Sequence, residues 1–163
     1  MKLRKLELKD APLMLEWMKD HDVCRYMQRD FNNMELNNCE DFIRRSSDTL
    51  HDLHMAIVDD SDEYMGTVSL KDIDYENGIA EFAITVRKAA MGKGYSIFGM
   101  REIIALGLDK LGLNSIIWCV SQQNLRANRF YDKNGFQKIS NIPERYKKIY
   151  GNYTSMNWYL VKK

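Results

Sequence analysis

Apolar residues recur with two different periods in the middle of this chain. Over residues 79–86 they alternate so that one face carries only apolar side chains, while Glu81 lies on the other face. This alternation predicts a strand that buries one face. From Ile97 to Leu111 the apolar residues recur every three or four positions, which predicts a helix with one buried face.

The rest of the chain follows the same two patterns, separated by polar turns. Further strands are predicted near residues 2–8, 55–58, 64–70, 115–120 and 156–160. Further helices are predicted after Asp10, over residues 35–50, and between Asn124 and Gly135. Asn77-Gly78 predicts a hairpin turn into the strand at 79–86. The order of these elements predicts an α/β fold in which helices cover both faces of a mixed sheet.

Composition restricts the partners of this protein. Its 163 residues are most simply one domain spanning 1–163, and the 24 basic and 23 acidic residues nearly cancel. A balanced charge without long basic runs argues against nucleic acid or an anionic membrane as the main partner. No segment approaches the ~18 apolar residues of a membrane helix, and no apolar run follows the basic start. We therefore expect a cytoplasmic protein.

Cysteine and histidine give no sign of a metal site. Cys24, Cys39 and Cys119 are odd in number and widely spaced, which favours reduced thiols over disulfides or zinc. The histidines also lack metal-ligand spacing with a nearby cysteine or a pair of carboxylates. The sequence therefore predicts no metal.

The strand at 79–86 runs into a glycine turn that opens directly into the following helix. The turn contains Gly92 and Gly94, and a helix start carries unpaired backbone N–H groups and a partial positive charge. This arrangement suits a phosphate or pyrophosphate. It is not a Walker loop, because Lys93 is followed by glycine, and Ile97 replaces the third glycine of the dinucleotide fingerprint. A purely structural turn is the alternative.

A second motif follows the predicted strand at 115–120. It reads Asn124-x-x-Ala127-x-x-x-Tyr131-x-x-x-Gly135-Phe136. Together with the glycine turn, it resembles the GNAT superfamily of acetyl-CoA-dependent N-acetyltransferases. The resemblance covers residues 79–137 and extends more loosely to residues 3–19. It implies a GNAT-like fold, with a central, mostly antiparallel mixed sheet of about seven strands and helices on both faces.

The resemblance has one departure, at Ala89. The family usually has Arg or Gln at this position, three residues before the first glycine of the turn. Arg87 and Lys88 lie close by in the sequence and are candidates to supply the missing charge to the diphosphate. The departure leaves open a non-catalytic module that binds acetyl-CoA, as an alternative to an enzyme.

The resemblance implies an enzyme that moves an acetyl group from acetyl-CoA to a primary amine by direct attack in a ternary complex. Most of the acceleration can come from holding amine and thioester together, with donors aimed at the oxyanion. Tyr131 is the candidate general acid, since a phenol of pKa near ~10 can protonate the departing thiolate. Alternatively, it only packs its helix on the sheet. Glu81 is the candidate base, relaying a proton from the amine through water; otherwise it is an exposed or salt-bridged strand residue.

The resemblance also implies how acetyl-CoA is bound. Backbone N–H groups of the glycine turn take the pyrophosphate, while Val86 and Arg87 pair with the pantetheine arm like an extra strand. Asn124 donates to a pantetheine amide, caps its helix, or does both. Arg126 and Arg129 reach the 3′-phosphate or are solvated at the surface. The candidates for binding this cosubstrate are therefore Val86, Arg87, Gly92, Lys93, Gly94, Tyr95, Ser96, Asn124 and Arg129.

The acceptor is indicated by residues 17–27. The pattern Trp17-x-x-Asp20-x-x-Val23-x-x-Tyr26-Met27 resembles the opening of two branches of the superfamily. One acetylates N-terminal amines of ribosomal proteins, and the other acetylates amino sugars carried on nucleotides. The candidate substrate-binding residues are Trp17, Tyr26 and Phe31, which either stack on a base or sugar or belong to the core.

We favour a nucleotide-linked amino sugar or another small amine as the acceptor. The alternatives are a protein N-terminus, a polyamine and an aminoglycoside. The acidic residues of this region are balanced by nearby bases and form no clear acidic pocket for a polycation. A homodimer through the last strands is common among similar proteins.

Overall fold

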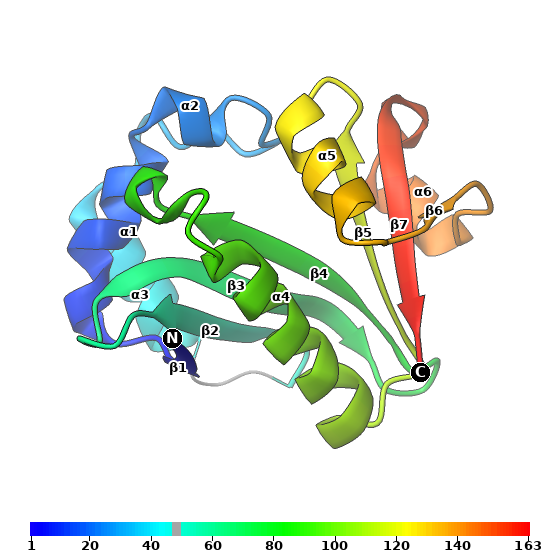
Figure 1. Ribbon diagram of the computed structural model, residues 1–163, viewed down its shortest axis with the longest axis horizontal. Coiled ribbons are helices and arrows are strands. Elements are labelled where there is room, and N and C mark those ends of the chain that lie inside the picture. Colours follow the sequence, from blue (N-terminus) through cyan, green and yellow to red (C-terminus); the bar gives the residue numbers. More distant parts are fainter. Residues whose placement is uncertain (47–49) are drawn as a thin grey trace.

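The computed structural model describes residues 1–46 and 50–163, in which seven strands form one sheet (Figure 1). Their order across the sheet is β1-β2-β3-β4-β5-β7-β6. The strands are β1 (Lys2–Lys5), β2 (Leu53–Val58), β3 (Tyr64–Asp74), β4 (Ile79–Val86), β5 (Ser115–Ser121), β6 (Lys138–Ile139) and β7 (Met156–Lys162). Neighbouring strands run antiparallel, except that β4 and β5 are parallel. The predicted mixed, mostly antiparallel sheet is confirmed.

Helices cover both faces of the sheet. One face carries α4 (Tyr95–Ala105) and α5 (Leu125–Lys133); the other carries α1 (Ala11–Met18), α3 (Leu36–Arg45) and α6 (Glu144–Ile149), and the short α2 (His21–Cys24) follows α1. Strand alternation separates the two sides. On β2, Ile57 packs in the core under α4, whereas Ala56 and Val58 pack in the core under α1 and α3.

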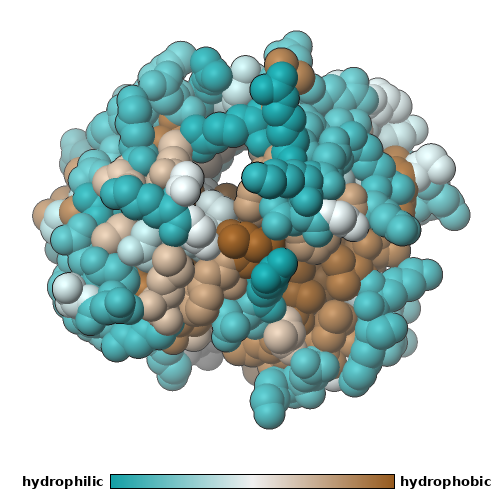
Figure 2. Space-filling model, in the orientation of Figure 1, coloured by the Kyte–Doolittle hydropathy of each residue, from teal (hydrophilic) through white to brown (hydrophobic). Residues whose placement is uncertain are grey.

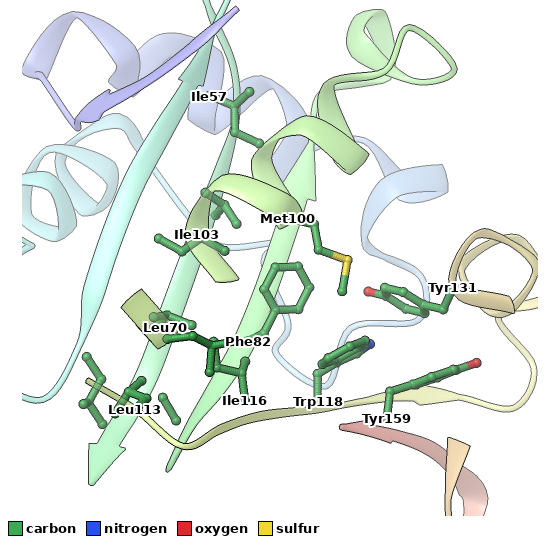
Figure 3. Packing of buried hydrophobic residues seen from close by; sticks show 14 of the residues in the cluster. Ile57, Leu70, Phe82, Met100, Ile103, Leu113, Ile116, Trp118, Tyr131 and Tyr159 are labelled. Atoms are coloured by element: carbon green, nitrogen blue, oxygen red, sulfur yellow. The ribbon is translucent and has the colours of Figure 1, made fainter. Parts of the chain in front are cut away.

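The largest core lies beneath α4 and α5 (Figure 3). Met100 and Ile103 of α4 lie over Leu70, Phe82 and other strand side chains. Burying one such side chain contributes about 1.5–3 kcal/mol relative to leaving it exposed. The helix can approach closely because it carries Gly99, where a Cβ atom would lie 2.4 Å from the Cδ1 atom of Ile57. This close packing fixes the start of α4 above the sheet.

A glycine precedes α4 and another follows the end of its helical continuation, as the sequence predicts. Gly94 is the N-cap and has a φ of 89°, in the left-handed region that favours glycine. After Ala105 the helix continues as a π-helical turn (Leu106–Lys110), and Gly112 follows with a φ of 71°. Leu113 is fully buried just beyond this end.

The long periodic elements lie where they are predicted, with shifted ends. The helix predicted over residues 35–50 ends at Arg45, and residues 47–49 of that prediction lie outside the described residues. The sequence analysis missed α2 and α6, because four and six residues are too short to display a helical period. No helix in the described part of the chain is long and apolar enough to cross a membrane.

Candidate active site

Strands β4 and β5 separate after a short parallel ladder. Only Ile79–Glu81 pair with Ser115–Ile117, and beyond this ladder the two strands diverge (Figure 1). The backbone N–H of Arg87 donates to the carbonyl of Met65 on β3, at 2.9 Å. Since successive backbone groups of a strand point to opposite edges, the main chain of Val86 faces away from β3, toward this split. β4 therefore offers an open backbone edge inside the split.

The glycine turn lies at the start of α4, directly after β4. The first N–H groups of a helix have no partner within it, so Tyr95 and Ser96 present free donors here. A Cβ added at Gly92 would meet no described atom within 4 Å, and one at Gly94 would meet only the Cε atom of Met1 at 3.7 Å. Lys93 is exposed beside them. This open cradle of N–H groups fits the pyrophosphate of acetyl-CoA, and the edge of β4 fits its amide-bearing arm.

Tyr131 lies on α5, on the same face of the sheet as α4. Asn124 caps this helix, because its Oδ1 accepts from the N–H of Ala127 at 3.1 Å. The Tyr131 ring is 7% exposed and packs beside Trp118 and Tyr159, with ring centroids 5.4 and 5.0 Å away. Its hydroxyl points across toward Met100 (Figure 3). Burial raises the pKa of Tyr131, so the phenol stays protonated over the physiological range.

Glu81 lies on the opposite face of the sheet, at the last residue pair before the strands separate. It is 4% exposed, so Glu81 is not an exposed strand residue, and it forms an ion pair. Its role as the base stays a prediction. The hydroxyl of Tyr150 donates to its Oε1, and Nζ of Lys71 lies 3.2 Å from the same atom. Burial, with the nearby Glu81 charge, raises the pKa of the Cys119 thiol to about 12. Glu81 thus lies on the face opposite Tyr131, where the split begins.

The structure argues against the expected role of Arg87. Its guanidinium lies 3.0 Å from Glu16 and 2.7 Å from Glu63, and it also donates to the carbonyl of Tyr64. Both of its backbone groups are bonded as well, since its carbonyl accepts from the N–H of Ala90. Arg87 therefore ties α1 to the β3–β4 pair, and it is not a free charge for a diphosphate.

Lys88, the other candidate to compensate for Ala89, lies 3.0 Å from Asp22 and 3.8 Å from Asp20. It is exposed, and water and salt screen an exposed ion pair of this kind. Its charge is therefore directed toward α2 in this structure.

The three aromatic candidates for substrate binding have different surroundings. Trp17 is 6% exposed, and its Nε1 donates to the hydroxyl of Tyr64 at 3.0 Å. Phe31 packs edge-on against Trp17, with centroids 5.3 Å apart. The structure therefore places Trp17 in the core, which is the alternative to substrate binding given in the sequence analysis. Tyr26 is half-buried and lies beneath Arg25, whose guanidinium carbon is 4.8 Å from the ring centroid.

A pocket of about 350 Å³ lies where the segment after α2 meets the start of α5. We call it the rim pocket; it is lined by Arg25, Tyr26, Gln123, Asn124, Leu125, Arg126 and Arg129. Close by, Nε2 of Gln28 donates to Oδ1 of Asn152 at 3.4 Å, linking the segment after α2 to the segment before β7. Figure 2 shows an opening among polar residues in this part of the surface. Tyr26, Asn124 and Arg129, which the sequence assigned to different ligands, thus come together.

Sequence reasoning missed the partners of Glu81. Lys71 lies opposite it across the β3–β4 hairpin, which the Asn77-Gly78 turn predicts, but an irregularity between Lys71 and Asp74 shifts the register. Tyr150 follows a six-residue helix that has no motif, so no sequence signal marks it. Within residues 1–46 and 50–163, no group of three or more His, Cys, Asp or Glu side chains could hold a metal ion.

Comparisons with known proteins agree on one family. A family model described as an acetyltransferase (GNAT) domain matches residues 1–137. A Bacillus licheniformis protein named "Uncharacterized N-acetyltransferase p20" is 30% identical over 141 residues, which cover 83% of this chain and 78% of that protein.

Solved structures share the fold. The spermidine N-acetyltransferase of Vibrio cholerae, crystallised with CoA and spermine, superposes with a TM-score of 0.80 at 19% identity, covering 99% of this chain and 94% of that chain. A structure described as a probable acetyltransferase gives a TM-score of 0.79 at 22% identity, covering 99% and 92%. At these identities the likeness confirms the fold class of the whole chain.

Proposed function

Since this chain belongs to the GNAT acetyltransferase family and is an acetyl-CoA-dependent N-acetyltransferase, we propose that it acetylates a primary amine of a small molecule by direct attack in a ternary complex. One observation carries this mechanism. Tyr131 and Glu81 lie on opposite faces of the sheet beside the β4–β5 split, and in our proposal thioester and amine meet through it. Holding the two reactants in this geometry replaces a bimolecular encounter.

The cosubstrate lies along the face that carries α4 and α5. Backbone N–H groups from Gly92 to Ser96 hold its pyrophosphate, favoured by the positive end of α4. The open edge at Val86 pairs with the pantetheine arm, and the amide of Asn124 is placed to donate to it. These contacts place the thioester beneath Tyr131.

The two buried side chains then divide the proton transfers. Glu81 accepts a proton from the ammonium through water, and the neutral amine forms a bond to the carbonyl carbon. As the tetrahedral intermediate collapses, the C–S bond breaks and the hydroxyl of Tyr131 protonates the departing sulfur. The phenol is suited to this step because burial keeps it protonated. The nitrogen loses its second proton to water, and a proton from water restores the phenol.

The acceptor we propose is a nucleotide-linked amino sugar, supported by the pattern over residues 17–27 and by Tyr26 at the rim pocket. A polyamine is the second candidate, because the spermidine N-acetyltransferase of Vibrio cholerae has the same fold. A protein N-terminus remains the third.

The test is thiol release from acetyl-CoA with a panel of amines, comprising nucleotide-linked amino sugars, polyamines, aminoglycosides and N-terminal peptides. We expect saturable release with one class and transfer of a single acetyl group to its amine, checked by mass spectrometry. Saturable release with a polyamine or peptide alone would reject the amino sugar. No release with any amine of the panel would contradict a small-molecule acceptor of these classes.

A further inference from the structure

We infer that the rim pocket binds a phosphate group of the acceptor, so that the substrate is a primary amine carrying a phosphate or pyrophosphate. This inference rests on the proposed transferase function and specifies its substrate class. It concerns the pocket where Arg25, Arg126 and Arg129 meet at the open end of the β4–β5 split.

The charge of the pocket selects an anion. None of its three arginines forms an ion pair with a described residue, whereas Arg4, Arg87 and Arg145 all do. No lining residue among those the structure describes carries a carboxylate. Asp22 acts on Arg25 electrostatically but forms its ion pair with Lys88. Three guanidinium groups that form no ion pair with a described residue attract phosphate, which arginine binds with two parallel hydrogen bonds. The same pocket repels a polyamine.

The rim pocket also has neutral groups that suit the rest of such a ligand. Arg25 is fixed over the ring of Tyr26 at 4.8 Å from its centroid, which holds one guanidinium in place. Gln123 and Asn124 add side-chain amides to the same wall. An anionic group bound in this pocket therefore meets both positive charge and hydrogen-bond donors.

The position of the pocket sets the length of the acceptor. Residues 123–126 precede Tyr131 by five to eight positions, which corresponds to about 10 Å along the chain at helical rise. An acceptor with its amine near Tyr131 and its phosphate in the rim pocket needs a spacing of this order. A sugar joined to a nucleoside diphosphate has this reach, whereas a free amino sugar does not.

The phosphate could also come from CoA, since its 3′-phosphate has the same chemistry. Two observations favour the acceptor. No residue of the glycine turn lines the rim pocket, and neither do Ala127 or Tyr131, the residues of α5 on the side of the split. Asn124 does line it and is the residue that the pocket shares with the proposed path of the pantetheine arm. On a helix with 100° per residue, Arg126 and Arg129 lie about 140° and 160° around the axis from Tyr131. They therefore face away from the proposed path of the cosubstrate.

The test compares two acceptors that share one amine. One is an amino sugar linked to a nucleoside diphosphate, and the other is its methyl glycoside, which has no phosphate. For Arg25→Gln/Arg129→Gln we expect KM of the nucleotide-linked acceptor to rise about 10- to 100-fold, as charged hydrogen bonds are lost. The KM values of acetyl-CoA and of the methyl glycoside should stay within twofold. Arg101→Gln, an exposed arginine of α4 outside the pocket, is the matched control.

Each other outcome overturns the inference. An unchanged KM of the nucleotide-linked acceptor would show that the rim pocket does not bind the phosphate of this acceptor. A raised KM of acetyl-CoA, with no such rise for 3′-dephospho-acetyl-CoA, would assign the pocket to the cosubstrate. If no amine is acetylated at all, the proposed function fails separately. The pocket is then tested by calorimetry with inorganic pyrophosphate, whose binding should weaken about tenfold in the double variant. Equal binding by both proteins would reject it.

Discussion

Tyr131 and Glu81 are both buried, but the surroundings of their polar atoms differ. Tyr131 is enclosed by aromatic rings, so burial raises its pKa and favours the neutral acid. Glu81 instead accepts a hydrogen bond from Tyr150 and lies beside the ammonium of Lys71, so its carboxylate is held by two polar partners. The proposed acid and the proposed base therefore differ in what surrounds their polar atoms.

Replacing Tyr131 by phenylalanine tests the acid. Tyr131→Phe keeps the aromatic packing and removes the proton donor, so we expect kcat to fall by roughly 10- to 1000-fold, the scale of a lost general acid. KM of acetyl-CoA should change less than twofold in steady-state assays. The control is Tyr75→Phe, since Tyr75 is 55% exposed and lies outside the site. Equal turnover by the two variants would contradict the assignment of Tyr131.

The hydrogen bond from Tyr150 gives a prediction about activity. Tyr150→Phe keeps the ring that packs edge-on against Trp158 and removes the hydroxyl that donates to Oε1 of Glu81. Because a buried carboxylate then loses one of its partners, we expect kcat/KM to fall about tenfold in steady-state assays. Tyr153→Phe is the control, since Tyr153 contacts the same small core. Equal kcat/KM values in the two variants would contradict a role for the hydrogen bond from Tyr150.

The thiol of Cys119 gives a prediction about its reactivity. Its pKa is raised to about 12 by burial, so the unreactive neutral form persists at every pH below this value. We expect iodoacetamide at pH 8 to leave Cys119 unlabelled in the folded protein, as read by peptide mass spectrometry. The same reagent should label it after denaturation in guanidinium chloride. Rapid labelling of the folded protein would contradict the raised pKa of this thiol.

At the scale of elements, the sequence predicted what has a period and missed what has none. The strand around Glu81 and the helix from Ile97 were predictable because apolar residues recur along each of them with a regular spacing. α6 was not, and with it Tyr150 was missed. Arg87 was misassigned for a related reason. Its partners Glu16 and Glu63 come from distant segments, which no local pattern connects to it.

The start of α4 is the element on which cosubstrate binding depends. A valine at Gly94 places a branched side chain over the N–H groups of the cradle, so we expect Gly94→Val to abolish acetyl-CoA binding in calorimetry. Valine is also strained at this φ of 89°. Gly112→Val is the matched control, because Gly112 has a φ of 71° and open space but lies at the other end of the helix. Equal affinities in the two variants would place the pyrophosphate elsewhere.

At the scale of the whole molecule, the sheet was predictable and the geometry of the site was predictable only in part. The order of strands and helices, together with the motif around Tyr131, implied a mixed sheet with helices on both faces. The rim pocket was not foreseen, because it joins Arg25 to Arg129 across more than one hundred residues of sequence. Contacts of this kind depend on tertiary packing, which leaves no periodic trace.

The short ladder between β4 and β5 has a consequence for heat resistance. Residues 1–112 and 113–163 meet in the sheet through three parallel residue pairs, so this seam contributes few backbone hydrogen bonds. A ligand that lies in the split contacts both parts and therefore stabilises their association. At one hundred times its Kd, acetyl-CoA should add about 2.7 kcal/mol to the unfolding free energy. Differential scanning calorimetry should then show the two parts melting together at a higher temperature with acetyl-CoA than without it.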